Sequence, residues 1–248
     1  MVDGSGSFKH LRKLFPTLLR HNPHMSVLTT FTPDNIEFLA DGIRRLHEDG
    51  FSVFYPGPDL EVAWEESDFE EVKKQYGQLA KIYREAMEAG HYLFVSLLDA
   101  KINSHVKIGA EICSCCDKND GEIAVAPSGN LYPCLRFVKQ DDDPKLCLGN
   151  VQTRLDRKKR ARIMMDAARE CADCLTCALR GRCFHYCSAV NFKTTETFNR
   201  PPEALCRLEQ LAIQAADEMA KDLYERKVPM FLRRYFPSEA PPQIQTAS

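Results

Sequence analysis

No cysteine precedes Cys113 in this chain of 248 residues, although the chain holds 11 cysteines. The chain also lacks any run of about 18 consecutive apolar residues, which excludes a membrane-spanning helix. Its amino-terminal residues contain no apolar segment followed by a small-residue cleavage site, so they do not form a secretory signal. We therefore expect a cytoplasmic protein with no membrane partner.

An excess of charge of one sign is also absent. Lys and Arg total 33, Asp and Glu total 35, and the formal net charge is −2. This near-neutral balance gives no reason to expect a nucleic-acid partner. The content of 44% hydrophobic and 27% charged residues is typical of a globular protein, and the length suits one large domain or two small ones.

The cysteines that are present all lie between Cys113 and Cys206. A disulfide scaffold is the first interpretation of such a cluster. The odd number of cysteines and the lack of a secretory signal argue against it. In a reducing cytosol, clustered cysteines more often bind metal ions or iron–sulfur clusters.

Residues 1–100 predict strands that alternate with helices. The three predicted strands are 26–31, 51–55 and 92–98. One predicted helix lies between Pro33 and Gly50, and a second begins with a capping box of Ser67 and Glu70. This alternation indicates parallel βαβ units. Three strands cannot close a barrel, so we interpret residues 1–100 as part of a larger α/β unit.

The remaining residues predict a different organisation. Alternating apolar residues indicate a hairpin over 121–134, with its turn at 127–130. Helices are predicted over 154–168 and from 202 to about 226. The tail from Lys227 contains four prolines and is predicted to be extended.

The cysteine spacing contains two linked patterns. One is C-x2-C-x5-C-x3-C, followed after 18 intervening residues by a further cysteine: Cys174, Cys177, Cys183, Cys187 and Cys206. The other is C-x12-G-x4-C, formed by Cys116, Gly129 and Cys134. A C-x2-C pair can place two thiolates on one metal or cluster from a single turn.

These seven cysteines, in this order, resemble the SPASM domain of radical S-adenosylmethionine enzymes. This auxiliary-cluster domain occurs in peptide- and protein-modifying members such as the anaerobic sulfatase-maturing enzymes. The flanking residues 121–134 and 148–151 also fit it. The resemblance covers 113–206 strongly and extends weakly over 1–100, which resemble the second half of a radical-enzyme partial barrel.

The resemblance implies an α/β protein with a partial (β/α) barrel half followed by a small Cys-rich domain and a C-terminal helix. The implied domains are a barrel half at 1–100, a SPASM [4Fe–4S] domain at 101–215, and a helix end with a Pro-rich tail at 216–248. It also implies two [4Fe–4S] clusters. Cluster I would take Cys113, Cys116, Cys134 and Cys187, and cluster II would take Cys174, Cys177, Cys183 and Cys206.

Several nearby residues have open roles in this scheme. Cys115 remains an alternative upstream ligand. Cys147 and Cys171 fall outside the motif. We expect Cys147 to be a buried thiol, and Cys171 to be either a reserve ligand or a buried thiol. Three basic side chains lie among the ligands in the sequence, and they either offset the cluster charge of about −2 or face solvent. They are Arg180, Arg182 and His185.

Zinc is the alternative to iron–sulfur chemistry, because both accept four thiolates and spacing alone does not separate them. A zinc-stabilised interaction module is therefore a further hypothesis. The order of all seven cysteines favours iron–sulfur clusters.

The sequence lacks the C-x3-C-x2-C loop of radical S-adenosylmethionine enzymes and the Gly-Gly-Glu element that grips the cofactor amine. As given, the chain is not expected to cleave S-adenosylmethionine, and this cofactor is expected only if a missing N-terminal half is present. The simplest interpretation is an incomplete chain, with Asp3 at a strand end near the cofactor. Whether this chain is itself an enzyme, of the oxidoreductase type that the family implies, is left open.

The resemblance implies a peptide or protein substrate and a reductase, or a flavodoxin- or ferredoxin-type electron donor. Sulfatase-maturing members carry an Asp after the cysteine that matches Cys134, and Leu135 stands there instead. A maturase that forms a thioether or a crosslink fits better than formylglycine formation. The alternative is a non-catalytic iron–sulfur protein for electron transfer or substrate docking. Three other carboxylates, Asp99, Asp117 and Asp120, are interpreted as turn or solvated residues.

Overall fold

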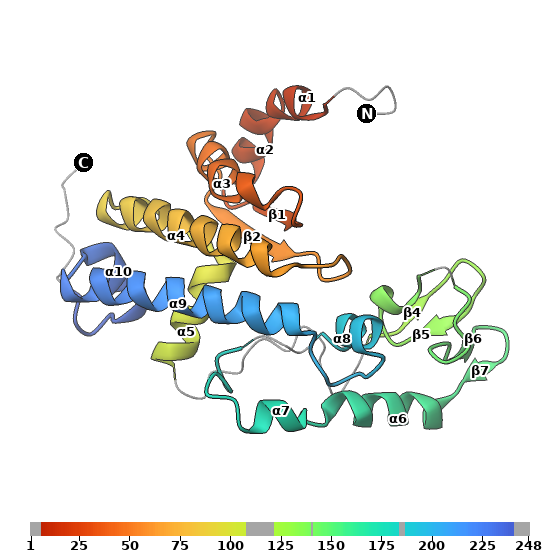
Figure 1. Ribbon diagram of the computed structural model, residues 1–248. Coiled ribbons are helices and arrows are strands. Elements are labelled where there is room, and N and C mark those ends of the chain that lie inside the picture. The colour runs from red at the N-terminus through yellow and green to blue at the C-terminus, as the bar shows by residue number, and fades with distance from the viewer. Residues whose placement is uncertain (1–5, 108–121, 140, 184–186, 241–248) are drawn as a thin grey trace. The chain divides into compact units, whose positions relative to one another are not determined.

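The computed structural model describes residues 6–107, 122–139, 141–183 and 187–240 (Figure 1). The chain divides into two compact units, the first made by residues 1–108 and 210–248 and the second by residues 109–209. Within the described ranges, no helix is long and apolar enough to span a membrane.

The first unit contains three strands and several helices. The strands are β1 (Ser26–Phe31), β2 (Val53–Pro58) and β3 (Phe94–Val95). The helices are α1 (Phe8–Arg12), α2 (Phe15–His21), η1 (Ile36–Phe38), α3 (Leu39–Glu48), α4 (Glu66–Glu88), α5 (Ser96–Val106) and α10 (Pro229–Tyr235). Helix α9 (Glu203–Glu225) begins in the second unit and ends in the first.

The three strands form a parallel sheet in the order β1-β2-β3. This confirms the predicted parallel βαβ arrangement. The third strand ends at Val95, three residues before the predicted end, because α5 begins at Ser96. The carboxylate of Asp99 accepts a hydrogen bond of 2.7 Å from the backbone N–H of Val95. This contact satisfies a free donor at the helix start and so favours the turn into α5.

The sheet buries one face and exposes the other. On the buried face Phe54 is fully covered, and the Phe31 ring meets Tyr76 of α4 edge-on with centroids 6.3 Å apart. On the other face Leu28 is 79% exposed and Tyr55 is 45% exposed. The two are partners in the β1–β2 register. Helix α4 therefore covers a single face of this sheet.

Helix α4 begins two residues away from the predicted capping box. Glu65 is the N-cap of a capping box, and its backbone N–H donates to the Asp68 carboxylate at 2.7 Å. Ser67 already lies inside the helix, so the predicted pair of Ser67 and Glu70 was wrong. The acidic pair gives the same hydrogen bonds and also places negative charge at the positive end of the helix dipole.

The predicted extended tail is wrong for the residues that form α10. Pro229 stands at the first helical position, where its fixed φ favours a helix and its missing N–H is not needed. Phe231 and Leu232 are buried, and α10 packs against α4. The apolar residues of α10 thus override the proline-rich composition around them.

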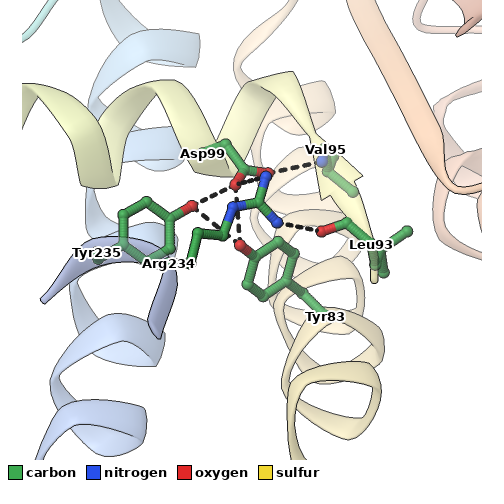
Figure 2. Close-up of polar contacts among 6 residues, drawn as sticks. All are labelled: Tyr83, Leu93, Val95, Asp99, Arg234 and Tyr235. Atoms are coloured by element: carbon green, nitrogen blue, oxygen red, sulfur yellow. Dashed lines mark hydrogen bonds and ion pairs between the residues drawn. The ribbon is translucent and has the colours of Figure 1, made fainter. Parts of the chain in front are cut away.

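A buried polar cluster joins α10 to α4 and α5 (Figure 2). Asp99 is fully buried and accepts hydrogen bonds from the hydroxyls of Tyr83, at 2.9 Å, and of Tyr235. Arg234 Nη2 lies 2.7 Å from Asp99 Oδ1, and its Nη1 donates to the Leu93 carbonyl at 2.7 Å. The interpretation of Asp99 as a turn or solvated carboxylate is therefore wrong, because Asp99 is buried and two of its partners, Arg234 and Tyr235, come from a distant part of the chain.

The second unit consists of short elements. They are β4 (Ala124–Val125), β5 (Leu131–Tyr132), η2 (Leu135–Phe137), β6 (Gly149–Asn150), β7 (Arg154–Leu155), α6 (Arg157–Ala168), α7 (Ala172–Leu175) and α8 (Ser188–Thr195). Strands β4 and β5 form the predicted antiparallel hairpin, and β6 and β7 form a second hairpin that was not predicted. Helix α6 begins after its N-cap Asp156, three residues later than predicted.

Candidate metal-binding thiols

Three cysteines of the second unit lie in or next to the single turn of α7. Cys171 is the N-cap, and the backbone N–H of Cys174 donates to the Cys171 carbonyl at 3.0 Å. The N–H of Cys177 donates to the Cys174 carbonyl at 3.3 Å. Because residues three apart in a helical turn are neighbours on its surface, these backbone contacts bring the three side chains to one side.

A fourth thiol reaches this turn from the start of α9. The Cys174 thiol hydrogen-bonds with Cys171 and interacts electrostatically with Cys206 and Cys177. Cys206 in turn interacts with Cys177 and Cys171. We call Cys171, Cys174, Cys177 and Cys206 the α7 thiol group. Of the four predicted ligands of cluster II it contains three, and its fourth member, Cys171, lies outside the motif.

Burial and the neighbouring thiols raise the pKa of two thiols of this group, Cys174 and Cys206. Burial, followed by the neighbouring Cys171, raises the pKa of Cys174 to about 11. Burial, followed by Cys177, also raises the pKa of Cys206. The backbone N–H of Leu179 donates to Cys177 Sγ at 3.4 Å. A bound cation would remove the repulsion and stabilise the thiolates, so the donor set fits a metal centre.

Cys134 and Cys187 form a second thiol pair, which we call the Cys134 pair. Cys134 is the N-cap of η2 and Cys187 is the N-cap of α8. Both pack against the cluster of buried residues that contains Tyr132 and Phe137. Burial is the main cause that raises the pKa of Cys134, and the electrostatic effect of Cys187 adds to it. The fold thus brings together two of the four predicted ligands of cluster I.

The structure describes some of the other predicted residues, and the rest lie outside the described residues. Cys183 is half-buried, and its backbone N–H donates to the Leu179 carbonyl at 3.2 Å. The half-buried Cys147 donates its thiol to the Gly149 carbonyl at 3.3 Å. Those outside the described residues are Asp3, Cys113, Cys115, Cys116, Asp117, Asp120 and His185.

Arg180, a charged residue that lies between the cysteines in the sequence, forms an ion pair with Glu170. Its Nε and Nη2 donate to the two carboxylate oxygens of Glu170 at 2.9 Å and 2.7 Å. This bidentate pair is half exposed. Arg180 therefore pairs with Glu170 across the loop that carries Cys171, Cys174 and Cys177, while its side chain stays half exposed to solvent.

Within the part of the chain that the structure describes, no three His, Cys, Asp or Glu side chains are close enough together to hold a metal ion. The α7 thiol group and the Cys134 pair are therefore gathered without having ligating geometry. Their chemistry still fits, since a tetrahedral zinc site and a [4Fe–4S] cluster each take four thiolates.

A comparison with protein-family models finds no match, and a comparison with curated proteins finds none either. Solved structures do match. Hexahistidine-tagged anSMEcpe with bound AdoMet aligns with a TM-score of 0.66 at 14% identity, covering 94% of this chain and 64% of that one. Native anSMEcpe with bound AdoMet and Cp18Cys peptide aligns with a TM-score of 0.64 at 14% identity, covering 90% and 64%.

This chain spans less than two thirds of the length of those structures. At such identity the likeness shows the fold, a mixed arrangement of helices and strands similar to that of an anaerobic sulfatase-maturing enzyme. The resemblance predicted from the cysteine spacing is confirmed at this level. The sequence analysis interpreted Cys171 only as a reserve ligand or a buried thiol. Its position three residues before Cys174 was the signal that could have placed it beside Cys174.

Proposed function

We propose that this chain is the auxiliary-cluster portion of a radical S-adenosylmethionine enzyme that modifies a peptide or a protein. The observation that carries the proposal is the sorting of the motif cysteines into two sets. Cys134 and Cys187 lie together in one set, and Cys174, Cys177 and Cys206 lie together in the other. The seven-cysteine resemblance assigns these same sets to different clusters.

The chain's own thiols would hold two [4Fe–4S] clusters. The Cys134 pair, with Cys113 and Cys116, would ligate the first cluster. Cys174, Cys177 and Cys206 would supply three ligands of the second, and the resemblance names Cys183 as the fourth. When bound, such clusters supply one-electron transfer. The backbone N–H of Leu179 donates to Cys177 Sγ. It would tune the reduction potential of the second cluster, because hydrogen bonds to ligand sulfurs shift that potential.

In this proposal the first unit is one half of a partial barrel. Parallel sheets are normally covered on both faces, yet the face that carries Leu28 and Tyr55 is exposed here. We propose that this face lines the barrel interior, with further strands completing the wall. The matched anSMEcpe structures contain AdoMet and a peptide, which supports the same two ligand classes for the complete barrel.

The proposed modification is one other than formylglycine formation. Leu135 follows Cys134 at the position where sulfatase-maturing members have Asp, and its side chain is 74% exposed. An aliphatic side chain cannot accept a proton. A thioether- or crosslink-forming reaction on a peptide is therefore the better candidate, with a flavodoxin- or ferredoxin-type donor or a reductase as electron source.

The test is the metal content of the full chain purified without oxygen. The proposal expects about eight iron and about eight sulfide per chain, a brown colour, and an electron paramagnetic resonance signal after reduction. The chain alone should form no 5′-deoxyadenosine from S-adenosylmethionine, because its 248 residues contain no C-x3-C-x2-C loop. A colourless protein that contains only zinc would overturn the proposal.

A second candidate fits the same two sets of cysteines. In it, the chain is an electron-transfer or substrate-docking protein that acts beside a separate radical enzyme. The intact mass from the native source separates the two. A mass well above 28.2 kDa, with added sequence that contains C-x3-C-x2-C, supports the first candidate, and 28.2 kDa with bound iron supports the second.

A further inference from the structure

Helix α6 carries basic side chains on one exposed face. Its exposed residues between positions 157 and 165 are Arg157, Lys158, Ala161, Arg162 and Met165. At about 3.6 residues per turn, these five positions fall on one side of the helix. Within the part of the chain that the structure describes, no carboxylate forms an ion pair with any of the three cations. We call these five residues the α6 basic face.

The positive charge of this face opposes the stability of the helix that carries it. The first turn of α6 contains no acidic residue, so Arg157 and Lys158 stand at the positive end of the helix dipole. Lys158 and Arg162 are four residues apart, a spacing at which like charges repel. The stability of α6 therefore does not account for these side chains. Folded proteins break such local rules mainly at functional sites.

The opposite face fastens α6 to the second unit. Ile163 is buried and packs in a cluster with Leu131 and Leu148. The Nζ of Lys159 donates to the Cys147 carbonyl at 2.7 Å. The fold thus holds the helix in place and presents the α6 basic face to solvent as a fixed surface.

A face of exposed cations attracts an acidic surface, and its other side chains indicate which kind. Residues 157–169 contain no aromatic side chain on which a nucleic-acid base could stack. The face also lacks the broad stripe of Leu, Phe or Trp with which a helix inserts into a lipid surface. Its one large apolar side chain is Met165, which is 64% exposed, and Met and Arg are both enriched at protein interfaces. A protein with an acidic patch therefore fits best.

The α6 basic face lies close to the thiols along the chain. Helix α6 ends at Ala168, and Cys171 follows as the N-cap of α7. Arg162 stands six residues before that end, which corresponds to about 9 Å along the helix axis. Electron-transfer partners meet through small interfaces, and complementary charge raises their association rate. A compact charged surface near the thiols suits such a partner.

We propose that the α6 basic face docks the acidic surface of the electron-donor protein. The inference rests on the proposed function, because that proposal supplies a donor of flavodoxin or ferredoxin type. Arg157, Lys158 and Arg162 bind and orient this donor through ion pairs, and Met165 adds apolar contact. These side chains take no part in the transfer of the electron itself.

The experiment measures binding to the full chain, purified without oxygen, by biolayer interferometry. The probes are a recombinant bacterial flavodoxin and a recombinant bacterial ferredoxin, each titrated separately. The wild-type chain should bind at least one of them. Its affinity should fall about tenfold or more between about 50 mM and about 500 mM NaCl, because salt screens exposed charges.

Arg157→Glu should weaken the binding about tenfold, because it places a carboxylate against an acidic partner. The same change should raise the melting temperature, because a carboxylate is favourable at a helix N-terminus. A loss of affinity in a more stable variant cannot come from unfolding. Lys73→Glu is the matched control, because it alters the net charge by the same amount at an exposed position of α4 in the first unit. It should keep the wild-type affinity.

The outcomes separate this inference from the proposed function. A wild-type chain without iron or sulfide defeats the proposed function. If the chain binds both clusters, failure to bind either donor at low salt defeats only the inference. Unchanged affinity in Arg157→Glu overturns it, and so does an equal loss in Lys73→Glu, because the attraction would then depend on net charge alone. Tighter binding of single-stranded RNA or of phosphatidylserine vesicles, lost in Arg157→Glu, would assign the face to another partner and also overturn it.

Discussion

Asp99 and Arg234 show how strongly a single residue pair depends on its surroundings. The side chain of Asp99 is 1% exposed and that of Arg234 is 18% exposed. Burial raises the pKa of Asp99, and Arg234, the two tyrosine hydroxyls and a backbone N–H oppose that effect. Burial also raises the pKa of Tyr83 and Tyr235, so both hydroxyls stay protonated and remain donors.

Removal of the Arg234 guanidinium would leave the Asp99 carboxylate buried without a counter-charge. We expect Arg234→Met to lower the free energy of unfolding by about 3 to 5 kcal/mol. Arg226→Met is the matched control, because Arg226 forms an exposed ion pair with Glu88 in the same unit, and it should cost about 1 kcal/mol or less. Urea denaturation followed by circular dichroism measures both. Equal losses would show that the Asp99 cluster does not stabilise α10.

The raised thiol pKa values predict how metal binding depends on pH. Because the pKa of Cys174 is about 11, its thiol is protonated near neutral pH and must release its proton to bind a metal. We therefore expect the affinity of the apoprotein for Zn²⁺ to rise between about pH 6 and about pH 8. Titration calorimetry in buffers of different ionisation enthalpy would count the released protons. An affinity that does not change with pH would contradict this prediction.

At the scale of elements, the two hairpins of the second unit depend on glycine. Gly129 has φ +86° at the turn between β4 and β5, and Gly149 in β6 has φ +120°. A Cβ at Gly149 would lie 2.1 Å from the Arg154 carbonyl oxygen, which belongs to the paired strand β7. Backbone atoms cannot move aside as flexible side-chain ends do, so only glycine fits here.

Gly149→Ala should therefore lower the melting temperature far more than Gly181→Ala. Both positions have positive φ, but a Cβ at Gly181 would meet no atom within 4 Å. The expected cost at Gly181 is about 1 kcal/mol from backbone strain, whereas Gly149→Ala adds a backbone clash to the same strain. Thermal unfolding followed by near-ultraviolet circular dichroism compares them. Similar melting temperatures would mean that the β6–β7 hairpin is not needed for stability.

At the scale of the whole molecule, the cysteines divide between the two units. All of them lie at positions 113–206, which belong to the second unit. Helix α10 and the strands β1 to β3 belong to the first unit and contain no thiol. Under the proposed function, metal bound by these thiols would therefore contribute free energy directly to the folding of the second unit.

Removal of metal should loosen one unit and leave the other intact. After chelation, we expect amide hydrogen exchange to accelerate in the second unit, from 122 to 209. Exchange in β1, α4 and α10 of the first unit should stay unchanged. Hydrogen-exchange mass spectrometry of the full chain, with and without a chelator, measures both regions at once. Equal acceleration in both units would contradict a metal role confined to the second.

The sequence by itself determined what short-range patterns encode. Apolar periodicity predicted the parallel strands, the hairpin around Gly129 and the long helix α9, because these signals lie within one element. Cysteine spacing predicted the family resemblance for a similar reason, since ligand geometry limits how many residues separate two thiols. The capping of α4, the end of β3 and the helix α10 were predicted wrongly, because neighbouring residues there permit more than one local structure.

Only the tertiary structure decided which distant residues meet. Two partners of Asp99, Arg234 and Tyr235, lie in α10, more than a hundred positions along the chain, and no local pattern links them to Asp99. Cys171 joined the α7 thiol group for the same reason, because Cys206 approaches it from the start of another helix. Burial and charge act through space, so the surroundings of a carboxylate or a thiol become known only once the chain has folded.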